Sequence, residues 1–245
     1  MKNFFKYVLN DLKSLYEYRI VLLVTILTFV FAMAMAVFPT LDPSNFIYFN
    51  IFILPVIIFS ISMFIGREEE TLLPVIKGTL KPIWVVFAKI IAAAIVELIP
   101  IVAFTIVLRY TGFETNYFLL FLTYLLGVIV HIIIALSLAI ISRKSSSLTL
   151  NYLVYILVFS ASAILYSNGL IPLNAQYIMI ISPAFLSAVL VDNILASSSY
   201  SESWLLLTAV FLQFVYAFIL VWFVIRPYFK IYLISSIIPY TSVKE

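Results

Sequence analysis

The chain has 245 residues, of which 65% are hydrophobic and only 10% are charged, and its mean hydropathy is +1.20. A soluble domain is roughly 45–50% apolar and about 25% charged, so this composition excludes an ordinary soluble protein and indicates an integral membrane protein. The chain has no cysteine, which excludes disulfides and thiolate chemistry.

Residues 1–19 are predicted to form an amphipathic helix that lies in the membrane interface. The polar residues Lys6, Asp11, Lys13 and Glu17 fall outside the apolar face at helical spacing. That face carries Phe4, Phe5, Val8, Leu9, Leu12, Leu15 and Tyr16.

Residues 20–225 are predicted to form a six-span transmembrane domain. A helix needs roughly 20 apolar residues to cross a membrane, and continuous apolar runs without alternation exclude a membrane β-barrel. The fold class is therefore all-α and polytopic. The predicted spans are Ile20–Phe38, Phe46–Ile65, Ile83–Leu108, Tyr117–Ile141, Leu148–Tyr166 and Trp204–Ile225.

The positions of the cations predict the orientation. Of the 14 lysines and arginines, only Arg109 falls on the side of the membrane opposite to the N-terminal segment. The positive-inside rule therefore places both termini in the cytoplasm, with residues 226–245 as a cytoplasmic tail.

The stretch Tyr177–Ala196 is long enough to be a seventh span, but it contains Pro183 and Asp192. Seven spans would also put the cations of the tail outside the cell. We therefore expect an extracellular or re-entrant helical element here, with Pro183 at a helix start or a break.

The segment between the second and third spans carries the most polar features of the chain. Thr71 is suited to cap a short helix, whose positive end would be near Glu68, Glu69 and Glu70, with Lys77 in its last turn. Between these charges lies a small apolar knob suited to a groove on a partner, made of Leu72, Leu73, Val75 and Ile76.

This segment resembles the cytoplasmic element of type-two ATP-binding-cassette (ABC) exporter permeases. Arg67 and Glu68 match the family's charged pair, Thr71 and Leu72 match its Thr-Leu, and Lys89 matches a later lysine. Glu70 and Thr79 depart from the usual Gly and Pro. The stretch "ISPAFLSAVL" is similar to the family's extracellular Ser-Pro element, and the interfacial helix and six spans also agree.

The resemblance implies a permease of the bacterial cytoplasmic membrane that works with partners. Two copies of a separate ATPase subunit would bind ATP and Mg, and a second permease subunit, identical or different, would complete the path. The segment from Arg67 to Lys77 would be the coupling helix that docks into the ATPase. The expected cargo is amphipathic or hydrophobic, with peptide favoured over drug or lipid.

No cofactor, metal or nucleic acid is expected to bind this chain, and catalysis by the chain is not expected. The five glycines form no phosphate-binding loop, and a single histidine without cysteine gives no transition-metal cluster. Two other functions remain open: a bacteriocin-immunity or sensor protein, and an intramembrane enzyme acting on lipids.

Three polar residues in the spans are candidates for a pathway lining or for helix packing: Glu97, His131 and Gln213. Glu97 and His131 both fall near mid-depth and could pair if their helix faces meet. Pro100 is expected to kink the third span. Lys89, just inside that span, is expected to snorkel to the cytoplasmic interface.

The predicted topology can be tested by cysteine labelling. Because the chain has no cysteine of its own, a Ser198→Cys variant carries a single thiol. An impermeant maleimide applied to intact cells is expected to label it from outside. Labelling only after the cytoplasmic side is opened would show that the topology is wrong.

Overall fold

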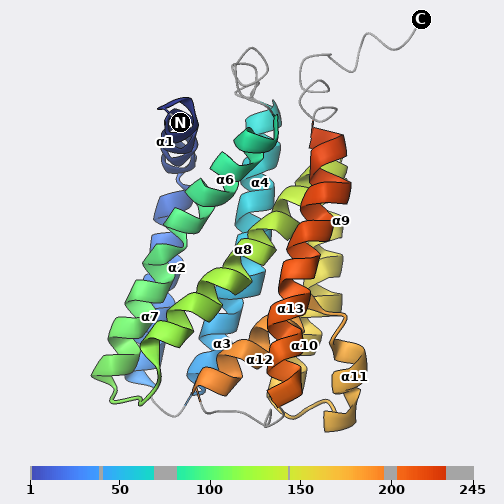
Figure 1. Cartoon of the computed structure of the whole chain (residues 1–245). Helices are drawn as coiled ribbons and strands as arrows, with labels where there is room; N and C mark the ends of the chain where they lie inside the picture. Colours follow the sequence, from blue (N-terminus) through green and yellow to red (C-terminus); the bar gives the residue numbers. More distant parts are fainter. Residues whose placement is uncertain (1, 39–40, 69–81, 143, 196–202, 230–245) are drawn as a thin grey trace, which may run out of the picture.

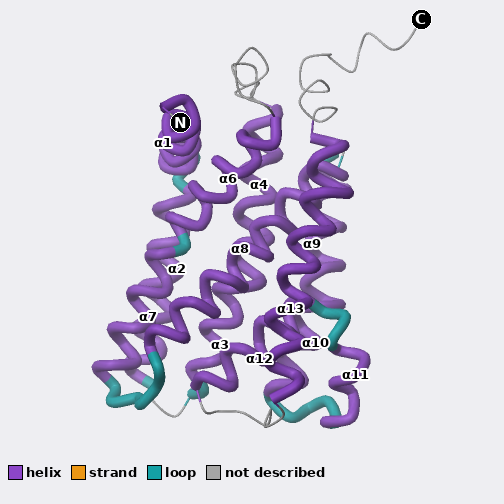
Figure 2. Tube along the Cα trace, in the orientation of Figure 1, coloured by secondary structure: helices purple, strands orange, loops and turns teal. Residues whose placement is uncertain are grey.

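The protein is an all-α bundle of membrane-spanning helices (Figure 1). The computed structural model describes residues 2–38, 41–68, 82–142, 144–195 and 203–229. Within these ranges all regular structure is helical, as Figure 2 shows. Six helices are long and apolar enough to cross a membrane, which confirms the predicted fold class.

The spans begin and end close to their predicted limits. They cover Ile20–Val37, Pro43–Ile65, Ile83–Tyr110, Tyr117–Ile141, Ser145–Ser167 and Trp204–Phe229. Only the first and fourth of these spans are uninterrupted α-helices, α2 (Ile20–Val37) and α8 (Tyr117–Ile141).

The other spans combine several helical segments. The second joins α3 (Pro43–Tyr48), the π-helical η1 (Phe49–Ile53) and α4 (Leu54–Glu68). The third joins α6 (Pro82–Val96) and α7 (Leu98–Tyr110). The fifth joins α9 (Ser145–Tyr155), the π-helical η2 (Ile156–Ser160) and α10 (Ala161–Ser167). The sixth joins α13 (Ser203–Ile219) and the π-helical η4 (Leu220–Ile225).

Local chemistry explains where two of the spans begin. Asp42 caps α3 by accepting a hydrogen bond from the backbone N–H of Ser44 at 2.9 Å, and Pro43 stands in the first turn. Asn116 caps α8 in the same way through the N–H of Leu119 at 3.1 Å. Both caps satisfy backbone donors that would otherwise have no partner at the helix start.

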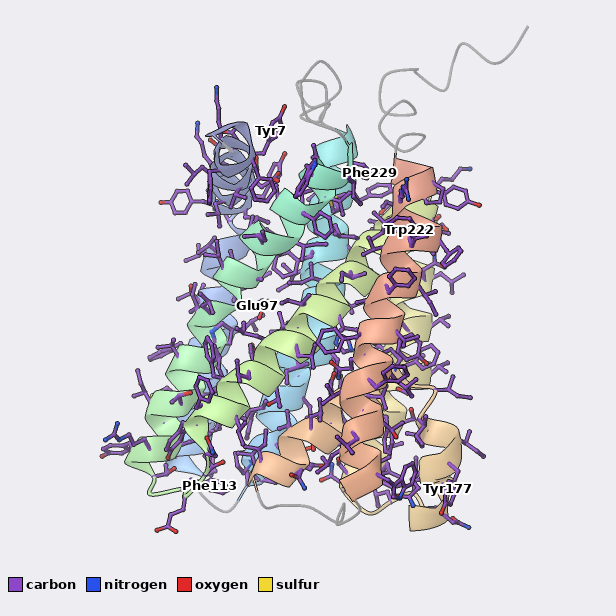
Figure 3. The ribbon with its side chains drawn as sticks, viewed as in Figure 1. Tyr7, Glu97, Phe113, Tyr177, Trp222 and Phe229 are labelled. Carbon is purple, nitrogen blue, oxygen red and sulfur yellow. The ribbon has the colours of Figure 1, made fainter. Side chains whose placement is uncertain are left out.

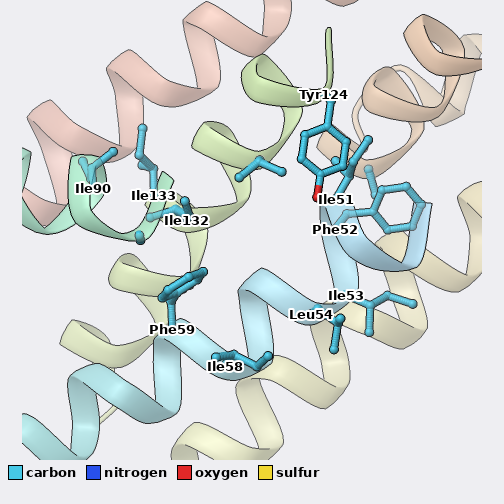
Figure 4. Packing of buried hydrophobic residues seen from close by; sticks show 14 of the residues in the cluster. Ile51, Phe52, Ile53, Leu54, Ile58, Phe59, Ile90, Tyr124, Ile132 and Ile133 are labelled. Carbon is cyan, nitrogen blue, oxygen red and sulfur yellow. The ribbon is translucent and has the colours of Figure 1, made fainter. Parts of the chain in front are cut away.

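The second and fourth spans form the centre of the bundle. Each is 67% buried within the protein, against 28% for the first span, 22% for the fifth and 17% for the sixth. Figure 4 shows the packing at this centre, where Phe59 of α4 lies near Ile132 of α8. The first, fifth and sixth spans therefore present most of the apolar surface that a bilayer would cover.

Both described ends of the chain lie at one end of the bundle. In Figure 3 the labelled Tyr7 and Phe229 are at this end, and Phe113 and Tyr177 are at the other. An even number of crossings, six in the described residues, brings the chain back to the side on which it starts. That this end faces the cytoplasm remains a prediction from the positions of the cations.

The stretch Tyr177–Ala196 does not form a seventh span. A 3₁₀ turn η3 (Leu173–Ala175) and a short α11 (Gln176–Met179) lead to α12 (Pro183–Leu195), a helix of 13 residues. α12 begins at Pro183, as the sequence predicts, and nearly all of its side chains are buried. It packs against α8, α10 and α13, so it is a structural element of the bundle interior.

The N-terminal helix α1 (Lys2–Glu17) packs along α6 rather than lying free in the interface. Val8 and Leu15 from its apolar face are buried against protein, whereas Phe5, Leu9 and Tyr16 are 62%, 65% and 74% exposed. The apolar face is thus divided between a protein contact and a surface suited to lipid.

An ion pair fixes this contact. The Asp11 carboxylate lies 2.7 Å from the Lys89 ammonium, and the two side chains are only 18% and 16% exposed. Phe4 and Trp84 make an edge-to-face ring contact beside it, at 5.9 Å. The ammonium of Lys89, which is expected to extend to the interface, thus pairs with a carboxylate of α1, the helix predicted to lie there.

Removal of Asp11 should destabilise the protein. Asp11→Ala leaves the Lys89 ammonium largely buried without a counter-charge, which should cost about 2 kcal/mol and lower the thermal denaturation midpoint in detergent. Adding Lys89→Met should recover most of the loss. The control is Glu17→Ala, which breaks the exposed Lys13–Glu17 pair on the same helix and should change nothing measurable. Equal losses in the two single variants would contradict the assignment.

Candidate functional site

The structure describes the helices on either side of the candidate coupling segment, but not most of the segment itself. Arg67 and Glu68 are the last two residues of α4, and the predicted docking residues Glu69, Glu70, Thr71, Leu72, Leu73, Val75, Ile76 and Lys77 lie outside the described residues. The end of α4 and the start of α6 lie at the same end of the bundle as α1 (Figure 1). The predicted coupling role of the segment therefore stays a prediction.

The third span is broken at its middle. α6 ends at Val96 and α7 begins at Leu98, so Glu97 stands at the break. Pro100, three residues later, cannot donate a backbone hydrogen bond, and its ring crowds the Val96 carbonyl. The break occurs at the level where the sequence places a kink, and it turns Glu97 into the interior, where it is 1% exposed.

Glu97 is held by a tyrosine of the fourth span. The Tyr124 hydroxyl donates a hydrogen bond of 3.3 Å to one Glu97 oxygen, Oε2, and Tyr124 is fully buried. The second oxygen, Oε1, has no hydrogen-bond partner in the described part of the chain. Figure 3 shows Glu97 at mid-height of the bundle.

His131 lies elsewhere, so the possible Glu97–His131 pair does not form. Its Nδ1 lies 2.7 Å from the Gly127 carbonyl, and its ring contacts Phe52 of η1 and Tyr155 of α9. His131 is seven residues beyond Tyr124 on α8, or about 10 Å along the helix axis. The two polar side chains therefore lie at different levels and contact different spans.

Gln213 joins the sixth span to α12. Its amide Nε2 donates a hydrogen bond of 2.8 Å to the Ser187 hydroxyl, and that hydroxyl donates to the Pro183 carbonyl at 3.1 Å. Both Gln213 and Ser187 are buried. Gln213 thus acts as a helix-to-helix contact in this structure, which was one of its two predicted roles.

Gly127 brings three elements close together. A Cβ at this position would lie 2.7 Å from the Ile51 side chain of η1 and 3.1 Å from the Ser187 hydroxyl of α12. Only glycine permits this approach, since contacts below 3.0 Å force a neighbour to move. The close crossing places Ser187, and with it Gln213, next to the turn of α8 that carries His131.

A second polar cluster lies toward the end of the bundle opposite to α1. The Asp192 carboxylate of α12 accepts hydrogen bonds from the Tyr48 hydroxyl and from the Ser167 hydroxyl, the latter at 2.7 Å. Asp192 belongs to the stretch that the sequence predicts to be an extracellular or re-entrant helical element, and it is 4% exposed. Its place nine residues after Pro183 in an apolar run was the available signal. The cluster ties α12 to the second and fifth spans.

The backbone of the second and fifth spans is irregular beside His131. η1 and η2 contact each other, and the Ser160 hydroxyl points to the Phe52 carbonyl at 3.5 Å. Short π-helical turns inside α-helices are frequent at functional sites. The candidate site is therefore the group of buried polar residues Glu97, Tyr124, His131, Tyr155 and Gln213. Within the described residues, no group of acidic or histidine residues could hold a metal ion.

The close crossing at Gly127 predicts the effect of one added methyl group. Gly127→Ala should destabilise the protein by about 1–3 kcal/mol, because Ile51 is a fully buried β-branched residue that has nowhere to move. Thermal denaturation in detergent measures the loss. The same substitution in an Ile51→Ala background should cost clearly less, since the clashing methyl is gone, and an equal cost would contradict this packing.

Comparison with family models, curated proteins and solved structures returned no match for this chain. Its function has to be inferred from its own residues and their arrangement.

Proposed function

We propose that the protein is the permease subunit of a bacterial ABC exporter, coupled to a separate ATPase subunit. The resemblance of the segment around Glu68 to Lys77 to a coupling helix motivates the proposal. One structural observation supports it most: α4 and α6, the helices that flank this segment, both contact the central fourth span.

These contacts give a physical route for coupling. α4 and α6 pack on α8, which carries Tyr124 and His131. A displacement of the segment between α4 and α6 would move both helices, because the segment joins them directly. In this proposal the irregular turn at Glu97, which separates α6 from α7, would be the point at which the third span bends. Closure of the ATPase could thus change the bundle at mid-depth.

The chemistry of the spans favours an amphipathic or hydrophobic cargo. The described interior holds few ionisable side chains at mid-depth, which does not suit a strongly charged small solute. Peptide is the favoured class, ahead of drug or lipid. The proposal further includes a second permease subunit, identical or different, and two ATPase subunits that bind ATP and Mg, in the bacterial cytoplasmic membrane.

The structure gives less support to the alternative that the chain is an intramembrane enzyme acting on lipids. That function required Glu97 and His131 as a catalytic pair, and each of them contacts other residues instead. A bacteriocin-immunity or sensor protein keeps the same six spans without transport, and the experiment below separates it from an exporter.

Charge placed on the apolar knob should uncouple the protein. Replacing Leu72, Leu73 and Ile76 by Asp is expected to abolish co-purification with the ATPase subunit and ATP-dependent export, because three carboxylates cannot enter an apolar groove without a large desolvation cost. Affinity purification from membranes and transport into inverted vesicles measure the two effects.

The matched control puts the same three charges in the predicted cytoplasmic tail, at Leu233, Ile237 and Ile238. This variant should keep ATPase association. The proposal would be overturned if the unaltered protein never associates with an ATPase subunit. It would also be overturned if the protein protects cells against a bacteriocin even when the ATPase is catalytically dead, which is the result expected of an immunity protein.

A further inference from the structure

Of the seven buried side-chain polar atoms that lack a hydrogen-bond partner in the described part of the chain, three belong to the fourth, fifth and sixth spans. They are Nε2 of His131 on α8, the hydroxyl oxygen of Tyr155 on α9 and Oε1 of Gln213 on α13. An unpaired polar atom costs free energy in any apolar interior, and in a membrane protein bulk water is not at hand to relieve it. The three atoms lie on α8 and on two helices that contact it, α9 and α13, so one explanation can serve all of them.

Hydrogen bonding fixes the chemical role of the imidazole. Nδ1 faces the Gly127 carbonyl at 2.7 Å, and a carbonyl oxygen only accepts, so Nδ1 carries the proton. In the neutral ring Nε2 is then a bare acceptor. The second-span Phe52 ring and the Tyr155 ring flank the imidazole at 5.8 and 6.0 Å between centroids.

The orientation of the Gln213 amide follows from its partner. The single proton of the Ser187 hydroxyl is donated to the Pro183 carbonyl, so the Ser187 oxygen must accept from Gln213, and the NH₂ group is the end that faces it. The opposite end, Oε1, is a second bare acceptor. Tyr155 supplies the complement, because its hydroxyl has a proton to donate.

Contacts on each side bring the three groups into one region between α8, α9 and α13. Tyr155 touches the His131 ring edge-on. Tyr216 packs against the buried cluster that contains Tyr155, and it lies one helical turn from Gln213 on the same face of α13. The Gly127 crossing places Ser187, the partner of Gln213, one turn of α8 from His131.

We propose that His131, Tyr155 and Gln213 form a binding site for one water molecule at mid-depth in the bundle. Water donates two hydrogen bonds, which match Nε2 and Oε1, and accepts one, which matches the Tyr155 hydroxyl. Other occupants fit less well. The hydroxyl of a ligand has a single proton and would leave either Nε2 or Oε1 unpaired, and an ammonium group cannot accept the hydrogen bond from the Tyr155 hydroxyl. Buried waters in proteins make typically about three such bonds to otherwise unpaired groups.

The site has a consequence for the bundle. A water held by three different spans stabilises their packing only while all three sides are in place, so relative movement of α8, α9 and α13 would release it. The proposal does not depend on an exporter function, since it concerns the chain without ATP or an ATPase subunit.

The single histidine makes a direct test possible. Labelling with ¹⁵N-histidine gives the full-length protein in lipid bilayers one imidazole, that of His131, for solid-state NMR. We expect a neutral ring protonated at Nδ1, an Nε2 resonance shifted by a hydrogen bond, and polarisation transfer from water protons to Nε2.

Substitutions of the other two residues of the site test whether the water is bound there. Tyr155→Phe and Gln213→Leu should each reduce water-to-Nε2 transfer, and the double variant should lose it. Tyr152→Phe, a partly buried tyrosine one turn away on α9, is the control and should leave the transfer unchanged.

Three results would overturn the proposal. They are a ring protonated at Nε2, an unaltered protein without water transfer to Nε2, and transfer that persists in the double variant. The first two are read on the unaltered protein, so a variant that fails to fold does not remove the test.

Discussion

The structure depends first on the need to pair backbone groups inside hydrocarbon. An amide or carbonyl there has no water to bind, so each crossing segment must be helical, and irregular backbone is tolerated only where protein covers it. The irregular turns of this chain obey that rule. The break at Glu97 lies beside Tyr124, and η1 and η2 face each other, with the Ser160 hydroxyl directed at the Phe52 carbonyl.

The same constraint gathers polar side chains where the helices deviate. Glu97, His131 and Gln213 each bond to a partner in the interior. Gly127 lets α8 approach Ile51 of η1 and Ser187 of α12, the partner of Gln213. Small residues at crossings and polar side chains between helices are the usual means of holding membrane helices together. In this protein both occur on α8, which carries Gly127, Tyr124 and His131 and is one of the two most buried spans.

The six spans could be predicted because apolar length is a strong and local signal. Pro183 predicted a helix start or a break, because its ring fits only the first turn of a regular helix, and α12 begins there. The sequence did not predict the partners of the polar residues. Glu97 and His131 occupy matching positions in their predicted spans, yet they bond to Tyr124 and to Gly127, because position along a span does not fix which faces meet. Asp11 with Lys89, and Asp192 with Tyr48, join residues far apart in sequence, which no local pattern encodes.

α12 also constrains how the protein is assembled. At 13 residues it is about 20 Å long, too short to cross a bilayer, and it carries Asp192 at its far end. Such a segment gains little from entering lipid alone, because the insertion machinery would meet a charged, short helix. Its environment exists only after the second, fifth and sixth spans stand beside it. Complete burial of α12 therefore requires the sixth span, which follows it in the chain, as well as the second, fourth and fifth spans, which precede it.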